Sequence, residues 1–337
     1  MSNKSRIPSA PITINWTLNF SCNFSCKHCY SRVEKMAELS TEQIKEIMRK
    51  VAVYKVPFIN YGGGEPLLRK DLFELTEYAT SLGYNVSMNT NAFLMNEENA
   101  RKAKEAGFKT VGISIDSTKP EVHDKFRNTP GSHKRAIEAA KFLREQGVRL
   151  TVSSVICRIN YQEFDLLVEQ AKSMGAEQIS LHNYKCTGMG MTNKDELDLS
   201  PEEWCDFYMK AIELRAKETG IRISMDDPIT ASIHKAPEQT IVKGSTCGKL
   251  SLNIRANGDV TPCGFIPVVI GNLLVDDLKD LWDGSKVLER MRNKEPKEKC
   301  KTCKHYEDCL GGCSARAYAM TGDFNSPDPH CWVEAKK

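Results

Sequence analysis

The sequence predicts an α/β protein in which a parallel β-sheet occupies about the first two thirds of the chain and a cysteine-rich region follows. Between about residues 12 and 225, short runs rich in β-branched residues alternate with amphipathic helical stretches. Repeated βα units of this length build parallel sheets. Several of the helical stretches end at a glycine, which favours a left-handed helix terminus. The pattern leaves open whether the sheet is doubly wound or closed into a barrel.

The individual elements follow from these runs. The expected strands cover residues 12–18, 58–61, 85–89, 110–115, 149–156, 178–182 and 221–225. A first helix begins at Ser40, where Ser-Thr-Glu-Gln forms a capping box that places Gln43 at the third helical position. Further helices are expected over residues 71–82, 97–106, 132–146, 161–174 and 201–219.

The rhythm changes after residue 225. Residues 226–246 are typical of a linker, and the Asn257-Gly258 turn predicts a hairpin of residues 250–255 and 260–262. One helix is expected over residues 277–291, and the remainder is predicted to be cysteine-rich loop that bound clusters must hold together. We therefore divide the chain into residues 1–225, a linker of residues 226–246, and residues 247–337.

Composition excludes several classes of protein. The chain has 337 residues, 27% of them charged and 40% hydrophobic, as in an ordinary globular protein. A net charge of +3 gives no global basic field for nucleic acid. We find no apolar run long enough to span a bilayer and no signal-peptide core at the start, so we expect a cytoplasmic protein without a membrane span.

Thirteen cysteines are the unusual feature of the composition. An odd number without an export signal argues against a disulfide framework. Most of them crowd into two groups with spacings of two to five residues, which is typical of metal or iron–sulfur ligation. Structural zinc is the alternative for the second group. Three cysteines lie between the groups and are predicted to be structural: Cys157, Cys186 and Cys205.

The first group spaces Cys22, Cys26 and Cys29 as C-x3-C-x2-C directly after the first predicted strand. Three thiolates on one loop can hold three irons of a [4Fe–4S] cube and leave the fourth iron open. This spacing resembles the signature of the radical S-adenosylmethionine (SAM) superfamily, in which the open iron chelates the methionyl amine and carboxylate. The resemblance implies that these three cysteines bind the cluster and that His28 lies near the adenine.

Further motifs resemble the same family in the same order. Gly63-Gly64-Glu65-Pro66 follows the second predicted strand, where glycines allow close backbone approach and a glutamate can accept from the methionyl ammonium. The resemblance implies that further polar residues bind the ribose and the carboxylate of SAM: Asn89, Ser114, Asp116 and Arg127. No catalytic acid or base is assigned.

The resemblance also decides the fold class that periodicity leaves open. It implies an α/β fold with a partial (βα)6 TIM-like barrel, with cofactors at the C-terminal ends of the strands. A small cysteine-rich SPASM domain with a β-hairpin and a helix is expected to follow the barrel.

The second group of cysteines matches the SPASM pattern, which implies two auxiliary [4Fe–4S] clusters and hence three clusters in all. By this resemblance an outer cluster is held by Cys300, Cys303, Cys309 and Cys331, and an inner cluster is held by Cys247, Cys263 and Cys313. The inner set is one cysteine short. Its fourth iron is therefore open, bound by Asp, Ser or His, or given to substrate.

The resemblance implies an enzyme that reductively cleaves SAM to a 5′-deoxyadenosyl radical and abstracts a substrate hydrogen, with auxiliary clusters that assist substrate oxidation or electron transfer. Residues 261–265 and 311–318 resemble the anaerobic haem-synthesis branch, which removes carboxylate-bearing side chains from iron tetrapyrroles. The alternative is a peptide-modifying maturase. The non-enzyme alternatives are a zinc-binding module and an electron-transfer module.

One surface predicts a protein partner. Residues 290–304 contain seven Lys or Arg against two acidic residues and belong to the region of the expected outer cluster. A basic face of this kind can dock an acidic protein. We therefore expect a flavodoxin or ferredoxin to act as reductant.

Overall fold

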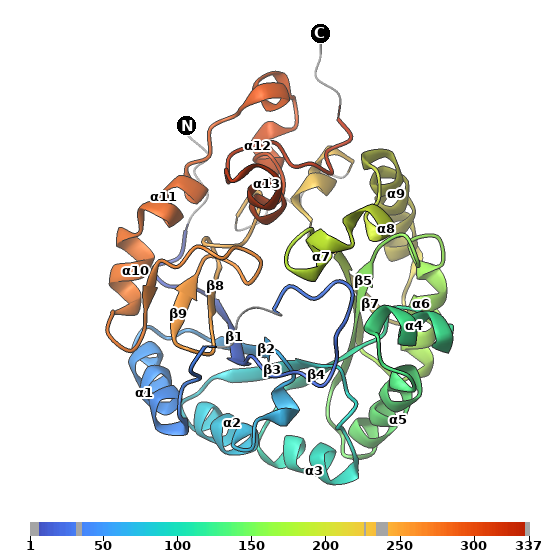
Figure 1. Cartoon of the computed structure of the whole chain (residues 1–337), viewed down its shortest axis with the longest axis vertical. Helices are drawn as coiled ribbons and strands as arrows, with labels where there is room; N and C mark the ends of the chain where they lie inside the picture. The colour runs from blue at the N-terminus through green and yellow to red at the C-terminus, as the bar shows by residue number, and fades with distance from the viewer. Residues whose placement is uncertain (1–6, 32–35, 226, 234–241, 334–337) are drawn as a thin grey trace.

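The computed structural model describes residues 7–31, 36–225, 227–233 and 242–333. Its centre is a ten-stranded sheet in the order β10-β9-β8-β1-β2-β3-β4-β5-β6-β7 (Figure 1). The strands are β1 Thr13–Asn19, β2 Phe58–Gly63, β3 Asn85–Thr90, β4 Thr110–Ser114, β5 Leu150–Ile156, β6 Gln178–Asn183, β7 Arg222–Ser224, β8 Ser251–Ile254, β9 Asp259–Thr261 and β10 Gly271–Asn272.

Strands β1 to β7 pair in chain order and every pair is parallel. The sheet ends at β7 on one side and at β10 on the other, so it curves into a partial barrel that does not close. Strand β8 joins the other side of β1 in parallel, and β9 returns antiparallel to β8. The predicted hairpin therefore extends the barrel sheet itself, while the exact domain boundaries stay a prediction.

The longer helices cover the outer face of this sheet, and shorter helices such as α7 lie towards the middle of the molecule (Figure 1). In the barrel region the helices are α1 Thr41–Ala52, α2 Leu72–Ser81, α3 Glu97–Glu105, α4 Pro120–Arg127, α5 Ser132–Glu145, α6 Phe164–Ser173, α7 Met189–Thr192, α8 Lys194–Leu197 and α9 Pro201–Lys217. The later ones are α10 Leu278–Gly284, α11 Lys286–Arg292, α12 Tyr306–Cys309 and α13 Ser314–Thr321. Short 3-10 turns are η1 Pro66–Leu68, η2 Pro228–Ser232 and η3 Glu298–Thr302.

Strand alternation separates an apolar core from a polar interior. In β1, Ile14, Trp16 and Leu18 are fully buried, as expected for the face that packs under the helices. The opposite faces of β2 to β7 line a polar cavity of about 470 Å³ that includes Asn60 and Ser153. The interior of the barrel is thus lined mostly by polar side chains, from serines to the longer Arg149 and Arg222, and has room for a ligand.

The structure corrects three expectations about the last third of the chain. The single helix expected over residues 277–291 is two helices, α10 and α11, because Ser285 ends the first and caps the second. The expected cysteine-rich loop is wrong for residues 314–321, which form α13 around a buried arginine. Part of the expected linker is ordered as η2, whereas residues 226 and 234–241 lie outside the described residues.

Sequence analysis also missed three short helices in the barrel region. Helix α4 follows β4 and brings Arg127 and Phe126 toward the first cysteine group. Helices α7 and α8 follow β6 and are only four residues each, which is too short for a helical period to be visible in the sequence. Within the part of the chain that the structure describes, no helix has the length and apolar character needed to cross a bilayer.

The capping box at Ser40 is confirmed and can be tested. The Ser40 hydroxyl accepts from the Gln43 N–H, and the Gln43 side chain accepts from the Ser40 N–H. We predict that Ser40→Ala lowers the free energy of unfolding by about 1 kcal/mol, because an exposed cap contributes through these bonds alone. Thermal unfolding should show a lower midpoint for Ser40→Ala and an unchanged one for Ser40→Asp, which keeps a capping oxygen. Equal midpoints for Ser40→Ala and the parent protein would contradict the prediction.

Candidate active site

The first cysteine group lies on the loop that leaves the C-terminal end of β1. Cys26 is buried, Cys29 is half-buried and Cys22 is exposed, and all three are free thiols. Burial raises the pKa of the Cys22 thiol and raises that of Cys26 to about 11. Thiolates in such surroundings need a cation beside them. The donor set therefore fits an iron–sulfur cluster, whose irons supply that charge.

The loop is anchored to the glycine turn after β2. The Gly64 N–H donates to the Asn19 carbonyl at 2.9 Å, and the Glu65 N–H donates to the Ser21 carbonyl at 2.8 Å. A Cβ added at Gly64 would lie 2.0 Å from the Ser21 carbonyl oxygen. Gly63 has a φ of +114°, a conformation that side chains disfavour. Both glycines are thus required by the close approach of two backbones.

Glu65 is held at the centre of this arrangement with 1% exposure. Its carboxylate accepts from the Thr90 hydroxyl at 2.6 Å, the Asn91 N–H at 2.8 Å and the Leu67 N–H at 3.1 Å. Burial raises the pKa of the carboxyl, and these three donors oppose that effect. The side chain is therefore fixed in one orientation beside the cysteine loop.

Sequence analysis missed the part played by Asn91. Its amide lies 3.9 Å from the Cys22 Sγ and donates to the Asn23 side chain at 2.8 Å, while its backbone N–H holds Glu65. Asn91 therefore links the glutamate to the cysteine loop. The available signal was the polar run Asn-Thr-Asn at the end of β3, of which only Asn89 was selected.

Asp116 and Arg127 are brought together and are engaged with each other. The Arg127 Nε donates to Asp116 at 2.6 Å, and the second oxygen of Asp116 accepts from the Val155 N–H at 2.8 Å. The guanidinium also interacts with the Cys26 thiol and holds the pKa of Asp116 below its usual value despite complete burial. In this structure the pair supports the cysteine loop, so a direct contact of either residue with SAM stays a prediction.

The remaining predicted SAM contacts are distributed around the loop and the barrel interior. His28 stacks on Phe126 with ring centroids 4.5 Å apart, and burial lowers its pKa to about 3, so the ring is neutral. Asn89 lines the 470 Å³ polar cavity. Ser114 ends β4 and pairs in register with Ser153 of β5. All three lie at or near the C-terminal ends of the strands, as expected.

The second cysteine group separates into the two predicted sets. Four cysteines line one small cavity together with Gly311 and Asp328: Cys300, Cys303, Cys309 and Cys331. The other three pack into a small apolar cluster around Ile266 and Phe324: Cys247, Cys263 and Cys313. A hydrogen bond between the Cys263 and Cys247 side chains lowers the pKa of Cys247 to about 7. The structure thus brings the members of each set together, and both sets fit iron–sulfur ligation.

Comparisons with known proteins agree with this geometry. Residues 17–171 match the model of the radical SAM superfamily, and residues 246–304 match the SPASM iron–sulfur cluster-binding domain. The AdoMet-dependent heme synthase of Methanosarcina barkeri is 30% identical, covering 96% of this chain and 97% of that relative. The chain belongs to the radical SAM superfamily.

Two further comparisons extend the result. The PqqA peptide cyclase of Granulibacter bethesdensis is 27% identical, covering 87% of this chain and 79% of that relative. The crystal structure of Streptococcus suis SuiB bound to S-adenosylmethionine superposes with a TM-score of 0.82 at 19% identity, covering 98% of this chain and 79% of that one, which shows the shared fold. This chain is therefore a radical SAM enzyme of the SPASM type that uses SAM and iron–sulfur clusters. The zinc-module and electron-transfer alternatives for the protein as a whole are set aside.

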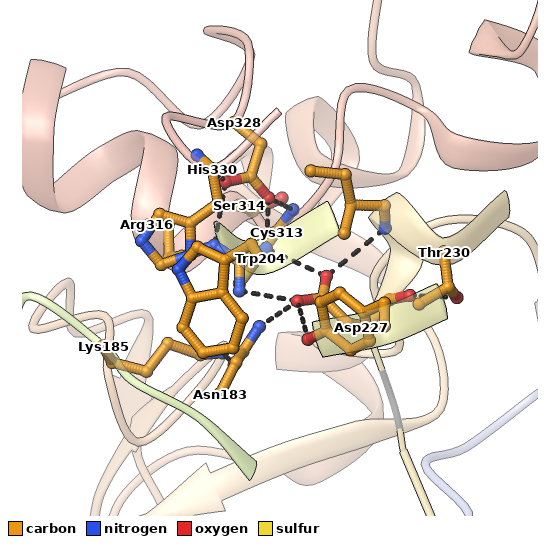
Figure 2. A network of polar contacts seen from close by, with 12 residues as sticks. Asn183, Lys185, Trp204, Asp227, Thr230, Cys313, Ser314, Arg316, Asp328 and His330 are labelled. Carbon is orange, nitrogen blue, oxygen red and sulfur yellow. Dashed lines mark hydrogen bonds and ion pairs between the residues drawn. The ribbon is translucent and has the colours of Figure 1, made fainter. Parts of the chain in front are cut away.

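A buried arginine connects the barrel of this radical SAM enzyme to its cysteine-rich region (Figure 2). Arg316 of α13 is 1% exposed and donates to both oxygens of Asp227, at 2.8 and 2.9 Å. Its Nε donates to Asp328 at 2.8 Å, and Asp328 in turn accepts from the Cys313 N–H at 2.7 Å. The two carboxylates raise the pKa of the guanidinium, so the charge is retained despite burial.

A chamber of about 370 Å³ is lined by residues that neighbour the first cysteine group and the inner cysteine set in the sequence. Tyr30 and Ser31, which follow Cys29, form one wall, and Phe265, two residues after Cys263, contributes to another. The Tyr30 and Phe265 rings are in contact, with centroids 4.2 Å apart. Arg255 also lines the chamber, with its guanidinium over the Phe20 ring. One bound molecule in this chamber would therefore be close to both cysteine groups.

The glycine turn gives a test of the first cluster site. We predict that Gly64→Ala displaces Ser21 and with it Cys22, so that the enzyme reconstituted under anaerobic conditions loses about four irons, the content of one [4Fe–4S] cluster. Gly62→Ala is the matched control, because a Cβ there meets nothing within 4 Å. Iron and sulfide analysis of both reconstituted variants measures this difference in cluster content. Full iron content in Gly64→Ala would contradict the prediction.

The arginine network predicts a pH-dependent stability. Arg316→Met leaves two carboxylates buried without their cation and should lower the free energy of unfolding by about 3–5 kcal/mol. The pKa of Asp328 is lowered in the folded state by Arg316, so this contribution is complete above the ordinary Asp pKa and is lost as the pH falls below about 4. Thermal unfolding between pH 3 and pH 7 should therefore show a smaller difference between the two proteins at pH 3 than at pH 7. A constant difference across that range would refute the assignment.

Proposed function

We propose that this radical SAM enzyme carries out the oxidative decarboxylation of a carboxylate-bearing substrate, specifically a propionate side chain of an iron tetrapyrrole. The observation that carries the proposal is the chamber between the two cysteine groups, because a substrate there can lose a hydrogen on one side and an electron on the other. The 30% identity to a heme synthase across nearly the full length of both chains supports the tetrapyrrole as substrate.

The chain offers three cluster sites for this reaction. Cys22, Cys26 and Cys29 would hold the SAM-binding cluster, with Glu65 and the residues at the strand ends around SAM. The inner set of Cys247, Cys263 and Cys313 and the outer set of four cysteines would each hold one auxiliary cluster. This assignment of the cysteines is the reason for dividing the chain into a barrel domain of residues 1–225, a linker of residues 226–246 and a cluster-binding domain of residues 247–337.

The chamber suits an anionic and largely apolar molecule. Phe20, Tyr30, Met191 and Phe265 give it aromatic and apolar walls. Among the residues that the structure describes, no ion pair joins Arg255 to a carboxylate, so its charge is available to a substrate. A guanidinium binds a carboxylate through two parallel hydrogen bonds. We expect Arg255 to bind the carboxylate of the reacting propionate or of a neighbouring propionate on the same tetrapyrrole.

An oxidative decarboxylation requires a source of the radical and an electron acceptor beside the substrate. When bound, SAM and its cluster supply a 5′-deoxyadenosyl radical that takes one hydrogen atom from the substrate. The substrate radical must then lose one electron and carbon dioxide for the propionate to become a vinyl group. An electron acceptor is therefore needed beside the chamber, and Cys263 and its partners of the inner set would hold it there.

A peptide substrate is the second candidate. It is favoured by the 27% identity to a PqqA peptide cyclase, which covers 87% of this chain. The same chamber would then hold a peptide side chain instead of a tetrapyrrole. The two candidates differ in whether carbon dioxide is released.

A reductant is expected to dock beside the outer cysteine set. Several basic residues of the 290–304 surface already have partners in the chain. Arg290 and Lys297 both pair with Asp323, and Lys299 donates to the Cys331 carbonyl. Lys301 and Lys304 remain exposed on either side of Cys303. Flavodoxin-driven turnover that is insensitive to both added salt and Lys301→Glu would contradict docking at this surface.

The proposed function is tested by product analysis with the reconstituted holoenzyme. With SAM, dithionite and an iron tetrapyrrole carrying ¹³C-labelled propionates, we predict one labelled carbon dioxide for each deoxyadenosine. Cys26→Ala should abolish both products, because it removes a ligand of the SAM-binding cluster. Deoxyadenosine without carbon dioxide from any tetrapyrrole, together with modification of a peptide, would overturn the tetrapyrrole assignment in favour of the second candidate.

Arg255→Gln tests how the substrate is held. We expect it to raise KM for the tetrapyrrole by about 10- to 100-fold, since the loss of a charge-assisted bidentate contact weakens binding. Substrate-independent release of deoxyadenosine should persist, because Arg255 is not among the predicted SAM contacts. Arg101→Gln is the matched control, since Arg101 lies on the surface of α3 and pairs with Glu105. An unchanged KM in Arg255→Gln would refute this role.

A further inference from the structure

We propose that Cys186, Asp198 and His330 form a binding site for a single zinc-type divalent cation, separate from the cluster cysteines and beyond the proposed function. Their ligand atoms, one from each residue, all lie within 4.8 Å of one another. The three residues come from different parts of the chain: the segment after β6, the end of α8 and the C-terminal segment. A thiol, a carboxylate and an imidazole are together a donor set that zinc binds.

The distances are already close to those of a tetrahedral site. The Cys186 Sγ lies 3.0 Å from the Asp198 Oδ2, and the His330 Nε2 lies 2.9 Å from the same oxygen. Neighbouring ligand atoms around tetrahedral zinc are roughly 3.3–3.6 Å apart, given Zn–S near 2.3 Å and Zn–N or Zn–O near 2.0–2.1 Å. The Cys186 Sγ and the His330 Nε2 would each need to move only about 0.5 Å away from the Asp198 Oδ2 to reach these distances.

The surrounding residues fix the ligands in place. The other oxygen of Asp198 accepts from the Leu199 N–H at 2.9 Å and from the Trp204 Nε1 at 3.3 Å, which leaves Oδ2 to face Cys186 and His330. The Trp204 ring stacks on the His330 ring with centroids 5.1 Å apart, and both are labelled in Figure 2. Such support of the ligands is a regular feature of metal sites.

His330 is held in a buried position beside Asp198. Its side chain is 5% exposed, and Nε2 is the ring atom that faces the Asp198 carboxylate.

The local charge does not oppose a cation. A cavity of about 210 Å³ lies against all three ligands and is also lined by Lys194, Asp195 and Arg316. The Arg316 charge is offset by the two carboxylates of Asp227 and Asp328. A fourth coordination position would open into this cavity, as in zinc sites that bind water or a substrate oxygen.

The test is zinc analysis of the anaerobically prepared holoenzyme together with X-ray absorption at the zinc edge. After incubation with one equivalent of zinc and desalting, we expect about one zinc per chain at unchanged iron content, with one sulfur and two or more nitrogen or oxygen neighbours. Zinc that had entered a cluster site instead would show three or four sulfurs, and this result would overturn the proposal.

Variants separate a metal site from a simple hydrogen-bond network. Cys186→Ala and the nearly isosteric Asp198→Asn should reduce retained zinc at least tenfold while iron content stays the same. Cys205→Ala is the matched control, because Cys205 lies on α9 outside the site and should retain zinc. Retention of zinc by Cys186→Ala, or no zinc in the parent and the control, would show that these three residues form only a hydrogen-bond network.

Discussion

The enzyme depends on the close contact between the cysteine loop after β1 and the glycine turn after β2. Two backbone hydrogen bonds join these segments, and a carbonyl oxygen occupies the space that any side chain at Gly64 would need. The same turn delivers Glu65, which Thr90 and Asn91 hold from β3. Because three neighbouring strands end at one place, the cysteine loop and the predicted SAM contact Glu65 share one rigid support.

The Arg316 network solves a different problem, which is to position the two auxiliary sets relative to the barrel. A buried ion pair adds little net stability compared with well-packed apolar residues. Its value here is geometric, because the Asp328 carboxylate holds the Cys313 N–H and the Asp328 carbonyl accepts from the Cys331 N–H. One residue therefore contacts the backbone of a cysteine from the inner set and of one from the outer set. Arg316 in turn ties that residue to Asp227, just after the barrel.

Sequence patterns predicted most of the barrel because its strands and longer helices carry clear periodicity, and the Ser40 cap carries a local signal. The grouping of the cysteines could be predicted because thiols spaced two to five residues apart are typical of metal or iron–sulfur ligation. The link from Asn91 to Cys22 could not, since it joins residues 69 positions apart. The engagement of Asp116 with Arg127 could not either, because helix α4, which carries Arg127, was not predicted. Helix α13 was missed because its buried face carries Arg316, and a sequence pattern assigns an arginine to the surface. Only the structure shows that Asp227 and Asp328 pair with this arginine and allow its burial.

The C-terminal segment is held by contacts between side chains as well as by its cysteine. Asp328 binds Arg316, His330 binds Asp198, and Cys331 lies against the outer set. The first two contacts use no cluster, so this segment has an ionic anchor to α13 and a hydrogen-bonded anchor at Asp198 before any iron is bound. Metal binding stabilises a fold most strongly when the unbound chain has no other order. A cluster held by the outer cysteine set would therefore enter a site that is already partly formed, and its loss alone should leave the barrel and α13 in contact.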